Sequence, residues 1–461
     1  MRETVAPPAF ATACHLHAQA SESVFQNAQL SLNLGELRPA TALRETWQRV
    51  IAAHNLLRSG FSKSSSGETV QCVSEPGELP WSSHDWTEVP LSDIPDRWNA
   101  FLEEDASLAF DITKPPLLRI QSIELPGGHC HQLITFPKLL LDEDTLFHVL
   151  CEWLEALDGA PRAVDESPAT PEPLMPAVAE WWTRFHAQAA EPVTFTLYPR
   201  PNITLKTTRI QSPECLLTRE TSRDLKALCQ RIAISPREAF LAIWALVLGR
   251  VTASKRVTLL AADSQTAPGN LLPCRTSIDN TLPIETWLKA VTKSESDRAR
   301  NAAIALERCL LLAVPARTLE DFSTAFFWSP PSLNDRLHDA FPRWINADAK
   351  LLARSQFPLT LQVRDGNRFA LQIEADPAHC PAAEANALLE RISRILDAIL
   401  ADPRQKVGDL DLLAASEREA LDRPTAPISL LPSASLEEEI STVAERHPEI
   451  PAILGPGDAD L

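Results

Sequence analysis

Residues 30–61, LSLNLGELRPATALRETWQRVIAAHNLLRSGF, carry the pattern that decides the fold. Leucines alternate with polar residues at the end of segment 24–34, which predicts a strand with one buried face, and Gly35 ends it. Apolar residues then recur at helical spacing over 43–57, which predicts an amphipathic helix of about four turns. A strand that leads directly into a helix indicates an α/β chain.

The same periodicities continue through the first part of the chain. Segments 117–123 and 131–136 have the pattern of strands, and 144–157 that of a helix, with the loop FPKLLLDE at 136–143 between them. A Pro-rich and charged stretch, DGAPRAVDESPATPEPLMP at 158–176, then predicts a linker. We therefore expect the main division of the chain there, with 1–175 as the first half.

The second half, 176–421, contains a strongly punctuated helix. Ser235 and Glu238 have the spacing of a capping box, and the body FLAIWALVLGRV at 240–251 is apolar nearly all round, which predicts a buried central helix. Segment 359–373 predicts a hairpin across the turn RDGN, followed by a helix from about Ala382.

The last segment, 422–461, forms a third part. It is Pro-rich to residue 435, after which Ser435 and Glu438 predict the start of a short helix. That helix has nothing large after it to pack against before the chain ends at Leu461, so we expect a longer polypeptide whose next domain begins here.

Composition excludes several classes of protein. The 461 residues carry 43 Lys and Arg against 61 Asp and Glu, and a net charge of −18 repels nucleic acids and anionic membrane surfaces. Gly is scarce, at 13 against 38 Pro, and no Gly-rich phosphate-binding motif occurs. No long apolar run predicts a membrane span.

The nine cysteines are scattered and never form CxxC, so the sequence predicts neither a disulfide framework nor a zinc knuckle. A reducing cytoplasm fits this usage best. Cys14, His15 and His17 have no fourth metal ligand nearby, and we expect them to lie in a flexible terminal segment.

The order of these segments, over about 20–421, resembles the condensation domain of nonribosomal peptide synthetases, a member of the chloramphenicol acetyltransferase-like superfamily. His54, Leu57, Arg58 and Phe61 match the end of the family's first helix. The other segments in family order are 110–119, FLAIWALVLGRVT, FPLTLQVRDGNRFALQIEADP and 406–421. Segment 435–454 is similar to the first helix and strand of an adenylation domain.

The resemblance implies two chloramphenicol acetyltransferase-like α/β sandwich halves that form a V-shaped pseudo-dimer with a tunnel at their junction. It also implies that the chain needs no cofactor of its own. Partner carrier proteins bring their substrates as phosphopantetheine thioesters, and an acceptor amine attacks the donor carbonyl to form an amide. An adenylation domain in the same chain is a further expected partner.

The family's signature, His-His-x-x-x-Asp-Gly, is altered at 137–143. Pro137 and Lys138 take the two histidine positions, and Glu143 takes the glycine position, so that Asp142 alone is retained. An imidazole can carry a proton at neutral pH, whereas lysine has an ordinary pKa of about 10.4. We expect the carboxylates of segment 142–144 to keep the Lys138 ammonium charged.

Two further expectations concern this loop. In the family the aspartate is mainly structural and is held by an arginine, a role for which Arg58 is the candidate here. His129, His131 and His148 are predicted to be structural, with His148 partly buried on the helix after the loop.

The sequence therefore predicts a degenerate condensation domain that has lost amide-bond formation. Such a domain serves as a platform for the adenylation domain or as an interface that recruits a tailoring enzyme. Two alternatives stay open: acyl transfer in which positioning does most of the catalysis and Lys138 or water handles the proton, and a different reaction in the tunnel, such as dehydration.

Overall fold

The computed structural model divides the chain into two compact units, Met1–Leu412 and Leu413–Leu461. The second unit contains helix α14 (Leu436–Arg446). The residues that the structure describes are 2–20, 22–34, 39–159, 175–188, 192, 212–263, 270–342, 345–377, 379–413, 417–419 and 436–446. The predicted linker at 158–176 and the Pro-rich stretch at 422–435 lie almost wholly outside these residues, and so does the cap expected at Ser435.

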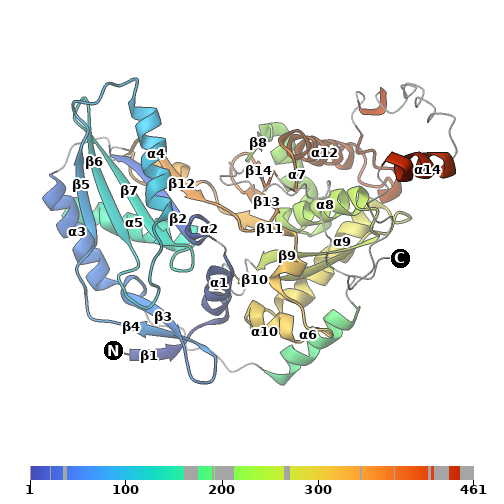
Figure 1. Cartoon of the computed structure of the whole chain (residues 1–461), viewed down its shortest axis with the longest axis horizontal. Helices are drawn as coiled ribbons and strands as arrows, with labels where there is room; N and C mark the ends of the chain where they lie inside the picture. Colours follow the sequence, from blue (N-terminus) through green and yellow to red (C-terminus); the bar gives the residue numbers. More distant parts are fainter. Residues whose placement is uncertain are drawn as a thin grey trace. The chain divides into compact units, whose positions relative to one another are not determined.

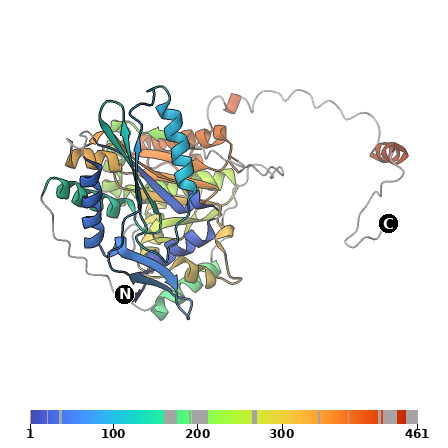
Figure 2. The same cartoon turned by 60° about the vertical axis from the view of Figure 1, so that its left-hand side comes forward.

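The first half of the chain folds around a five-stranded sheet in the order β12-β2-β7-β6-β5 (Figure 1). Its strands are β2 (Asn27–Leu34), β5 (Trp81–Asp85), β6 (Arg119–Leu125), β7 (His129–Pro137) and β12 (Ile345–Ala353). Helices α3 (Ala40–Ala53) and α5 (Glu143–Leu157) cover one face, where Trp47 stacks on Trp153 with ring centroids 4.9 Å apart. Helix α4 (Ile94–Ser107) lies along the other face, as Figure 2 shows in light blue.

Strand β2 differs from its prediction because α4 covers the face that was expected to meet solvent. Seven of its eight residues are buried. The polar side chains on the α4 face bond to the helix instead of water: the Asn27 amide donates to the carbonyl of Ala106 (3.1 Å), and the Gln29 amide donates to the carbonyl of Leu102 (3.1 Å). Buried polar groups are tolerated when they are bonded in this way.

The second half of the chain folds around a six-stranded sheet in the order β10-β9-β11-β13-β14-β8. Its strands are β8 (Glu214–Leu216), β9 (Arg256–Asp263), β10 (Asn270–Ser277), β11 (Thr324–Ser329), β13 (Leu359–Arg364) and β14 (Ala370–Ala375). The helices are α6 (Pro176–Gln188), α7 (Arg219–Ile232), α8 (Pro236–Val251), α9 (Ile284–Ala299), α10 (Leu306–Leu311) and α12 (Ala382–Ala401), with the short η2 (Leu319–Asp321) and η3 (Val407–Asp409).

Helix α8 confirms the prediction of a buried, capped helix. The Ser235 side chain accepts from the backbone N–H of Glu238, and the Glu238 side chain accepts from the N–H of Ser235. Residues 237–249 are all buried, so the helix forms the centre of the core of the second half. The hairpin β13–β14 and helix α12 also lie where the sequence predicts them.

Strand β12 is an element of the second half that lies in the sheet of the first half. It follows β11 in the chain, yet it pairs antiparallel with β2 and completes the sheet of the first half. Helix α11 (Leu333–Ala340) directly precedes this strand, and its Leu333 and Leu337 are buried in the same core as α5. Segment 345–353, which lies in the predicted second half of the sequence, therefore belongs to the sheet of the first half, and no local pattern indicated this.

The terminal segment with Cys14, His15 and His17 is a helix, α1 (Pro8–Gln19), and not a flexible tail. Its Thr12 hydroxyl donates to Asn270 Oδ1 (2.6 Å) and accepts from the N–H of Leu306 (2.9 Å), so that it ties the first half to the second. The remaining elements are β1 (Arg2–Val5), β3 (Ser59–Lys63), β4 (Thr69–Val73), α2 (Ser23–Gln26) and η1 (Leu56–Arg58).

Metal clusters and membrane-spanning helices are both missing from the described residues. No group of three or more His, Cys, Asp or Glu residues among them is arranged to hold a metal ion. No single helix among them is long and apolar enough to cross a membrane, although α7 and α8, which meet at an angle of 102°, reach that composition together.

Candidate functional site

The altered motif loop joins β7 to α5, and its own leucines pack it against the core of the first half. The N–H of Lys138 donates to the carbonyl of Gln26 (2.8 Å), and the N–H of Leu140 donates to that of Pro137 (2.9 Å). Residues 139–141 are at most 6% exposed and pack in the core of the first half. The three leucines therefore anchor the loop to the core of the first half.

Asp142 is the N-cap residue of α5. Its Oδ1 accepts from the N–H of Thr145 (2.7 Å), a bond that satisfies one of the free donors at the start of the helix. Arg58 donates instead to the carbonyl of Ser74 (2.6 Å) and to Asn55 Oδ1 (2.8 Å). The predicted pairing of Arg58 with Asp142 is therefore wrong, because each side chain is bonded within its own segment.

Glu143, at the glycine position of the motif, connects the two halves. Both of its carboxylate oxygens lie 2.8 Å from Nη1 of Arg364 on β13. Its Oε1 also accepts from the N–H of Leu333, at the start of α11 (3.1 Å). The Glu143 and Arg364 side chains are 11% and 22% exposed, so this ion pair is largely removed from water.

Asp144 pairs with an arginine of α11, the helix that packs with α5 in the core of the first half. Its Oδ1 lies 2.7 Å from Nη1 of Arg336 on α11, whose guanidinium lies over the ring of Phe147 at 4.0 Å. Together with the cap at Asp142 and the pair at Glu143, this accounts for all three carboxylates of segment 142–144. The expectation that they hold the Lys138 ammonium charged is therefore wrong.

Lys138 occupies the second histidine position, and its side chain is partly exposed. The Nζ atom donates to the backbone carbonyl of Arg354, 2.7 Å away and 216 residues further along the chain. Within the described part of the chain, no carboxylate lies within ion-pair distance of this amine. Burial lowers the pKa of Lys138 to about 8, against the opposing charge of Glu374.

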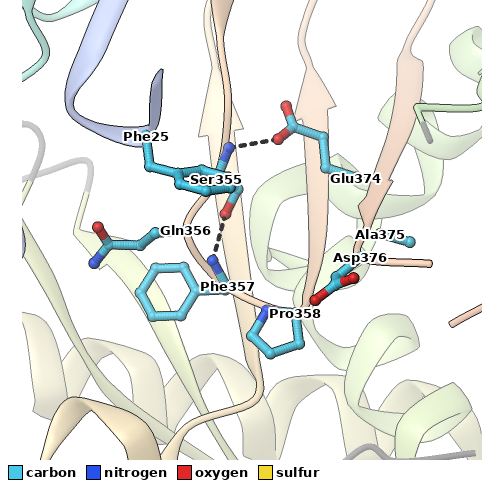
Figure 3. A pocket seen from close by; sticks show the side chains of 8 residues that line it. All are labelled: Phe25, Ser355, Gln356, Phe357, Pro358, Glu374, Ala375 and Asp376. Atoms are coloured by element: carbon cyan, nitrogen blue, oxygen red, sulfur yellow. Dashed lines mark hydrogen bonds between the residues drawn. The ribbon is translucent and has the colours of Figure 1, made fainter. Parts of the chain in front are cut away.

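A small cavity lies between Phe25 and two segments of the second half, 355–358 and 374–376 (Figure 3). Its Glu374 is 9% exposed and accepts from the N–H of Ser355 (2.6 Å), the residue after the carbonyl that Lys138 contacts. The volume, about 80 Å³, is room for two or three waters at about 30 Å³ each. The cavity is lined by Phe25, Ser355, Gln356, Phe357, Pro358, Glu374, Ala375 and Asp376.

The sequence did not predict that Glu374 and His17 lie near Lys138. Burial raises the pKa of Glu374, although the Ser355 hydrogen bond and the charge of Lys138 act to lower it. Burial and the charge of Lys138 lower the pKa of His17 to about 4, so this imidazole is neutral at pH 7. Both residues come from distant segments, and neither has a local motif that points to the loop.

The other histidines take structural positions or face solvent. The His131 ring stacks on Trp98 with ring centroids 4.5 Å apart and lies 2.9 Å from the Ser31 hydroxyl. His129 begins β7 after a turn in which Gly127 and Gly128 both have positive φ. His148 is exposed rather than partly buried, because it lies on the outer side of α5.

Solved structures include chains with the same arrangement of elements. The condensation domain of monacolin K polyketide synthase superposes with a TM-score of 0.69 at 15% identity, covering 88% of this chain and 99% of that one. The chain has the condensation-domain fold. The starter condensation domain of rhizomide synthetase gives a TM-score of 0.65 at 17% identity, covering 90% of this chain and all of that domain. The predicted α/β class with two sheet-bearing halves is thereby confirmed.

Sequence comparison places the same fold within much larger relatives. The chain is 22% identical over 400 residues to a linear gramicidin synthase protein from Brevibacillus parabrevis, and 22% identical over 407 residues to chondramide synthase from Chondromyces crocatus. These matches cover 82% and 83% of this chain but only 5% and 10% of the synthases. No family model matches the sequence. The condensation-domain fold of this chain thus corresponds to a small segment of each relative.

Proposed function

We propose that this chain is the condensation-domain region of a nonribosomal peptide synthetase and is inactive in amide-bond formation. It serves as a structural platform or as an interface domain that recruits a partner in peptide biosynthesis. The fold, and the distant similarity to a segment of several synthases, support the assignment to this region. The chemistry of the motif loop supports the loss of activity.

The observation that carries the proposal is the use of the loop's polar groups. Lys138 is bonded to the Arg354 carbonyl, Asp142 caps α5, and Glu143 is bonded to Arg364 and the N–H of Leu333. A lysine with a pKa of about 8 is about nine-tenths protonated at pH 7. It therefore acts at neutral pH mainly as a donor, whereas a catalytic imidazole must also accept a proton from the attacking amine.

The proposed role implies partners that deliver or use thioesters. These are carrier proteins with phosphopantetheine arms, an adenylation domain in the same chain, and a tailoring enzyme as the recruited partner. The region itself takes no cofactor, and its place in the cell is the cytoplasm. The net charge of −18 favours a basic partner surface over nucleic acid.

The decisive experiment is an amide-formation assay with two loaded carrier proteins. The native chain is compared with Lys138→His, which restores an imidazole, and with Lys138→Ala, which removes the amine. We expect the native chain and Lys138→Ala to form no more product than the carriers alone. Turnover by the native chain that Lys138→Ala abolishes would overturn the proposal.

The platform role has a separate test. Adenylation activity of the downstream region, measured as amino-acid-dependent ATP–pyrophosphate exchange, is compared with and without this chain attached. A platform increases the soluble yield or the exchange rate of the attached region. Equal yield and rate in the two forms would leave only the recruitment role.

One observation favours a second candidate, an acyltransferase or other modifying domain that acts on carrier-bound aminoacyl thioesters without histidine. The pKa of about 8 makes Lys138 a far better base at pH 7 than an ordinary lysine, and positioning alone supplies roughly 7 kcal/mol or more in favourable cases. This candidate predicts a rate that rises to a plateau above about pH 8 and disappears in Lys138→Ala. A pH-independent background in both proteins would exclude it.

A further inference from the structure

A second pocket lies in the first half, at the opposite end of the sheet from the motif loop. It has a volume of about 250 Å³ and forms where the start of α4 meets the β6–β7 turn and the end of β2. His129, which begins β7, lines this pocket, and Pro137 ends the strand. At about 3.3 Å per residue, the pocket is therefore about 26 Å from the loop.

The walls of this pocket are mainly apolar. They include Leu91, Ile94, Pro95, Leu125 and Pro126. Leu91 is 73% exposed, whereas Leu125 packs against the buried cluster beneath α4, so the wall is held by the core and open to solvent. An apolar cavity of about 150 Å³ can hold benzene, and pockets for drug-sized ligands begin at about 300 Å³. The pocket therefore fits one aromatic or aliphatic side chain.

Two polar side chains complete the lining, and each has an unpaired atom. Within the described part of the chain, Asn33 Oδ1 and His129 Nδ1 are buried and have no hydrogen-bond partner. A buried polar atom without a partner costs stability, and such atoms are rare in folded proteins. A small rotation of either side chain towards the pocket allows it to bond a polar group that an occupant brings.

The edge of the pocket is acidic. Asp93 and Asp96 are exposed and stand on either side of Ile94 and Pro95 at the start of α4. Asp93 accepts from the Ser92 hydroxyl (2.8 Å), and neither carboxylate has an ion-pair partner among the described residues. The guanidinium of Arg97, on the same helix, lies over the ring of Trp86 at 4.7 Å. The edge therefore favours a positively charged occupant.

We infer that this pocket is the docking site of a recruited protein, which inserts one aromatic side chain from a basic segment. The volume and the apolar walls select the anchor, and the two carboxylates select Lys or Arg beside it. That the partner is a recruited enzyme rests on the proposed function, whereas the chemistry of the pocket does not. Because the pocket is remote from the motif loop, docking leaves the loop free.

The test uses the full chain and the photoreactive peptide Arg-Lys-X-Lys-Arg, in which X is para-azidophenylalanine. After irradiation with up to about 1 mM peptide, mass spectrometry of proteolytic fragments locates the adducts. We expect saturable labelling of the segments that line the pocket, 91–95 and 125–129. Unlabelled Arg-Lys-Phe-Lys-Arg should suppress it about tenfold more effectively than Arg-Lys-Ala-Lys-Arg, because only the first peptide buries a ring.

Matched variants separate the walls from the charges. Leu91→Ser removes an exposed part of the wall and should reduce labelling at least about threefold, whereas Val314→Ser, at a 93% exposed position of the second half, should not change it. The double variant Asp93→Asn with Asp96→Asn should weaken binding about threefold at low salt and reduce its dependence on salt.

Three results would each refute the inference: equal competition by the Phe and Ala peptides, native labelling of Leu91→Ser, or adducts that avoid both segments. Because the assay contains no carrier protein or acceptor amine, such a result would leave the proposed loss of amide formation untouched. Amide formation by the native chain would in turn refute the proposed function and leave the docking site standing.

Discussion

Replacing Glu143 by Gln tests whether the altered motif loop holds the two halves together. The substitution keeps the size of the side chain and an oxygen that can accept from Leu333, but removes the negative charge. Arg364, 22% exposed on β13, then keeps a charge without its ionic partner. The result depends on how much of that charge water can stabilise.

The geometry sets the expected cost. Removing one partner of a fully buried ion pair costs roughly 3–5 kcal/mol, and an exposed pair is worth about 0–1 kcal/mol. The pair of Glu143 and Arg364 lies between these limits but nearer the buried one, because its side chains are 11% and 22% exposed. The amide of Gln still bonds to the guanidinium, so we expect a loss of about 2 kcal/mol.

The assay is urea unfolding of the full chain, with the change in free energy taken from the shift in midpoint and the slope. Asp144→Asn is the matched control, since Asp144 is 57% exposed in its pair with Arg336 and its charge should cost less than about 1 kcal/mol. The double variant with Arg364→Met should show a coupling energy of about 1–2 kcal/mol.

The reasoning fails if Glu143→Gln lies within about 0.5 kcal/mol of the Asp144→Asn control. It also fails if the effects of Glu143→Gln and Arg364→Met simply add. Either result would mean that the contacts of Glu143 exist without stabilising the junction, and that the rest of the interface holds the halves by itself.

Three further changes have definite expected results. The pKa of Lys138 is about 8 in the folded chain and about 10.4 in the unfolded chain, so the unfolded state binds more protons between these values and the native chain becomes more stable as the pH rises. Lys138→Met removes this dependence. In unfolding assays its free energy of unfolding relative to that of the native chain should therefore be higher at pH 7 than at pH 10, by about 2–3 kcal/mol. Burial acts to raise the pKa of Asp105, but hydrogen bonds from Arg119 and other groups lower it below its ordinary value. The stability that the Asp105 carboxylate gives the fold is therefore lost as the pH falls through that lowered pKa. Asp105→Asn should cost about 3 kcal/mol at pH 7 and make the free energy of unfolding depend less on pH in acid. Ser235→Ala removes the cap of α8 and should cost about 1 kcal/mol in the same unfolding assay, whereas an unchanged midpoint would mean that packing alone fixes the helix start.

The elements that sequence alone predicted are those set by local periodicity. The capping box of α8, the hairpin β13–β14 and helix α12 each depend on residues a few positions apart. Strand β12 could not be predicted in its place, because its partner β2 is far away in the sequence and antiparallel pairing leaves no local trace. The burial of both faces of β2 was missed for the same reason, since the cover comes from α4.

The candidate site was predicted in position but not in its contacts. Lys138 and Asp142 were identified by the register of the motif, and both lie in the loop between β7 and α5. The partner of the lysine was predicted from sequence proximity, which favoured the carboxylates of 142–144. In the structure Asp142 caps α5, Glu143 bonds to Arg364 and Asp144 bonds to Arg336. The groups that act on Lys138 are Arg354 and Glu374. Contacts between the halves were beyond reach because a single sequence shows no pairing of distant residues.

Two charged residues of this loop, Glu143 and Lys138, differ in whether hydrogen bonds and an opposite charge compensate the cost of burying them. Glu143 is partly buried and is given an arginine and a backbone N–H, so its charge is compensated and it serves as a structural contact. Lys138 is partly buried and its amine contacts only a carbonyl, so the cost of burial is not compensated and its pKa is lowered. The charge at Glu143 therefore stabilises the junction of the halves, whereas the charge at Lys138 lowers stability at neutral pH, and Glu143→Gln and Lys138→Met are expected to shift the free energy of unfolding in opposite directions at pH 7.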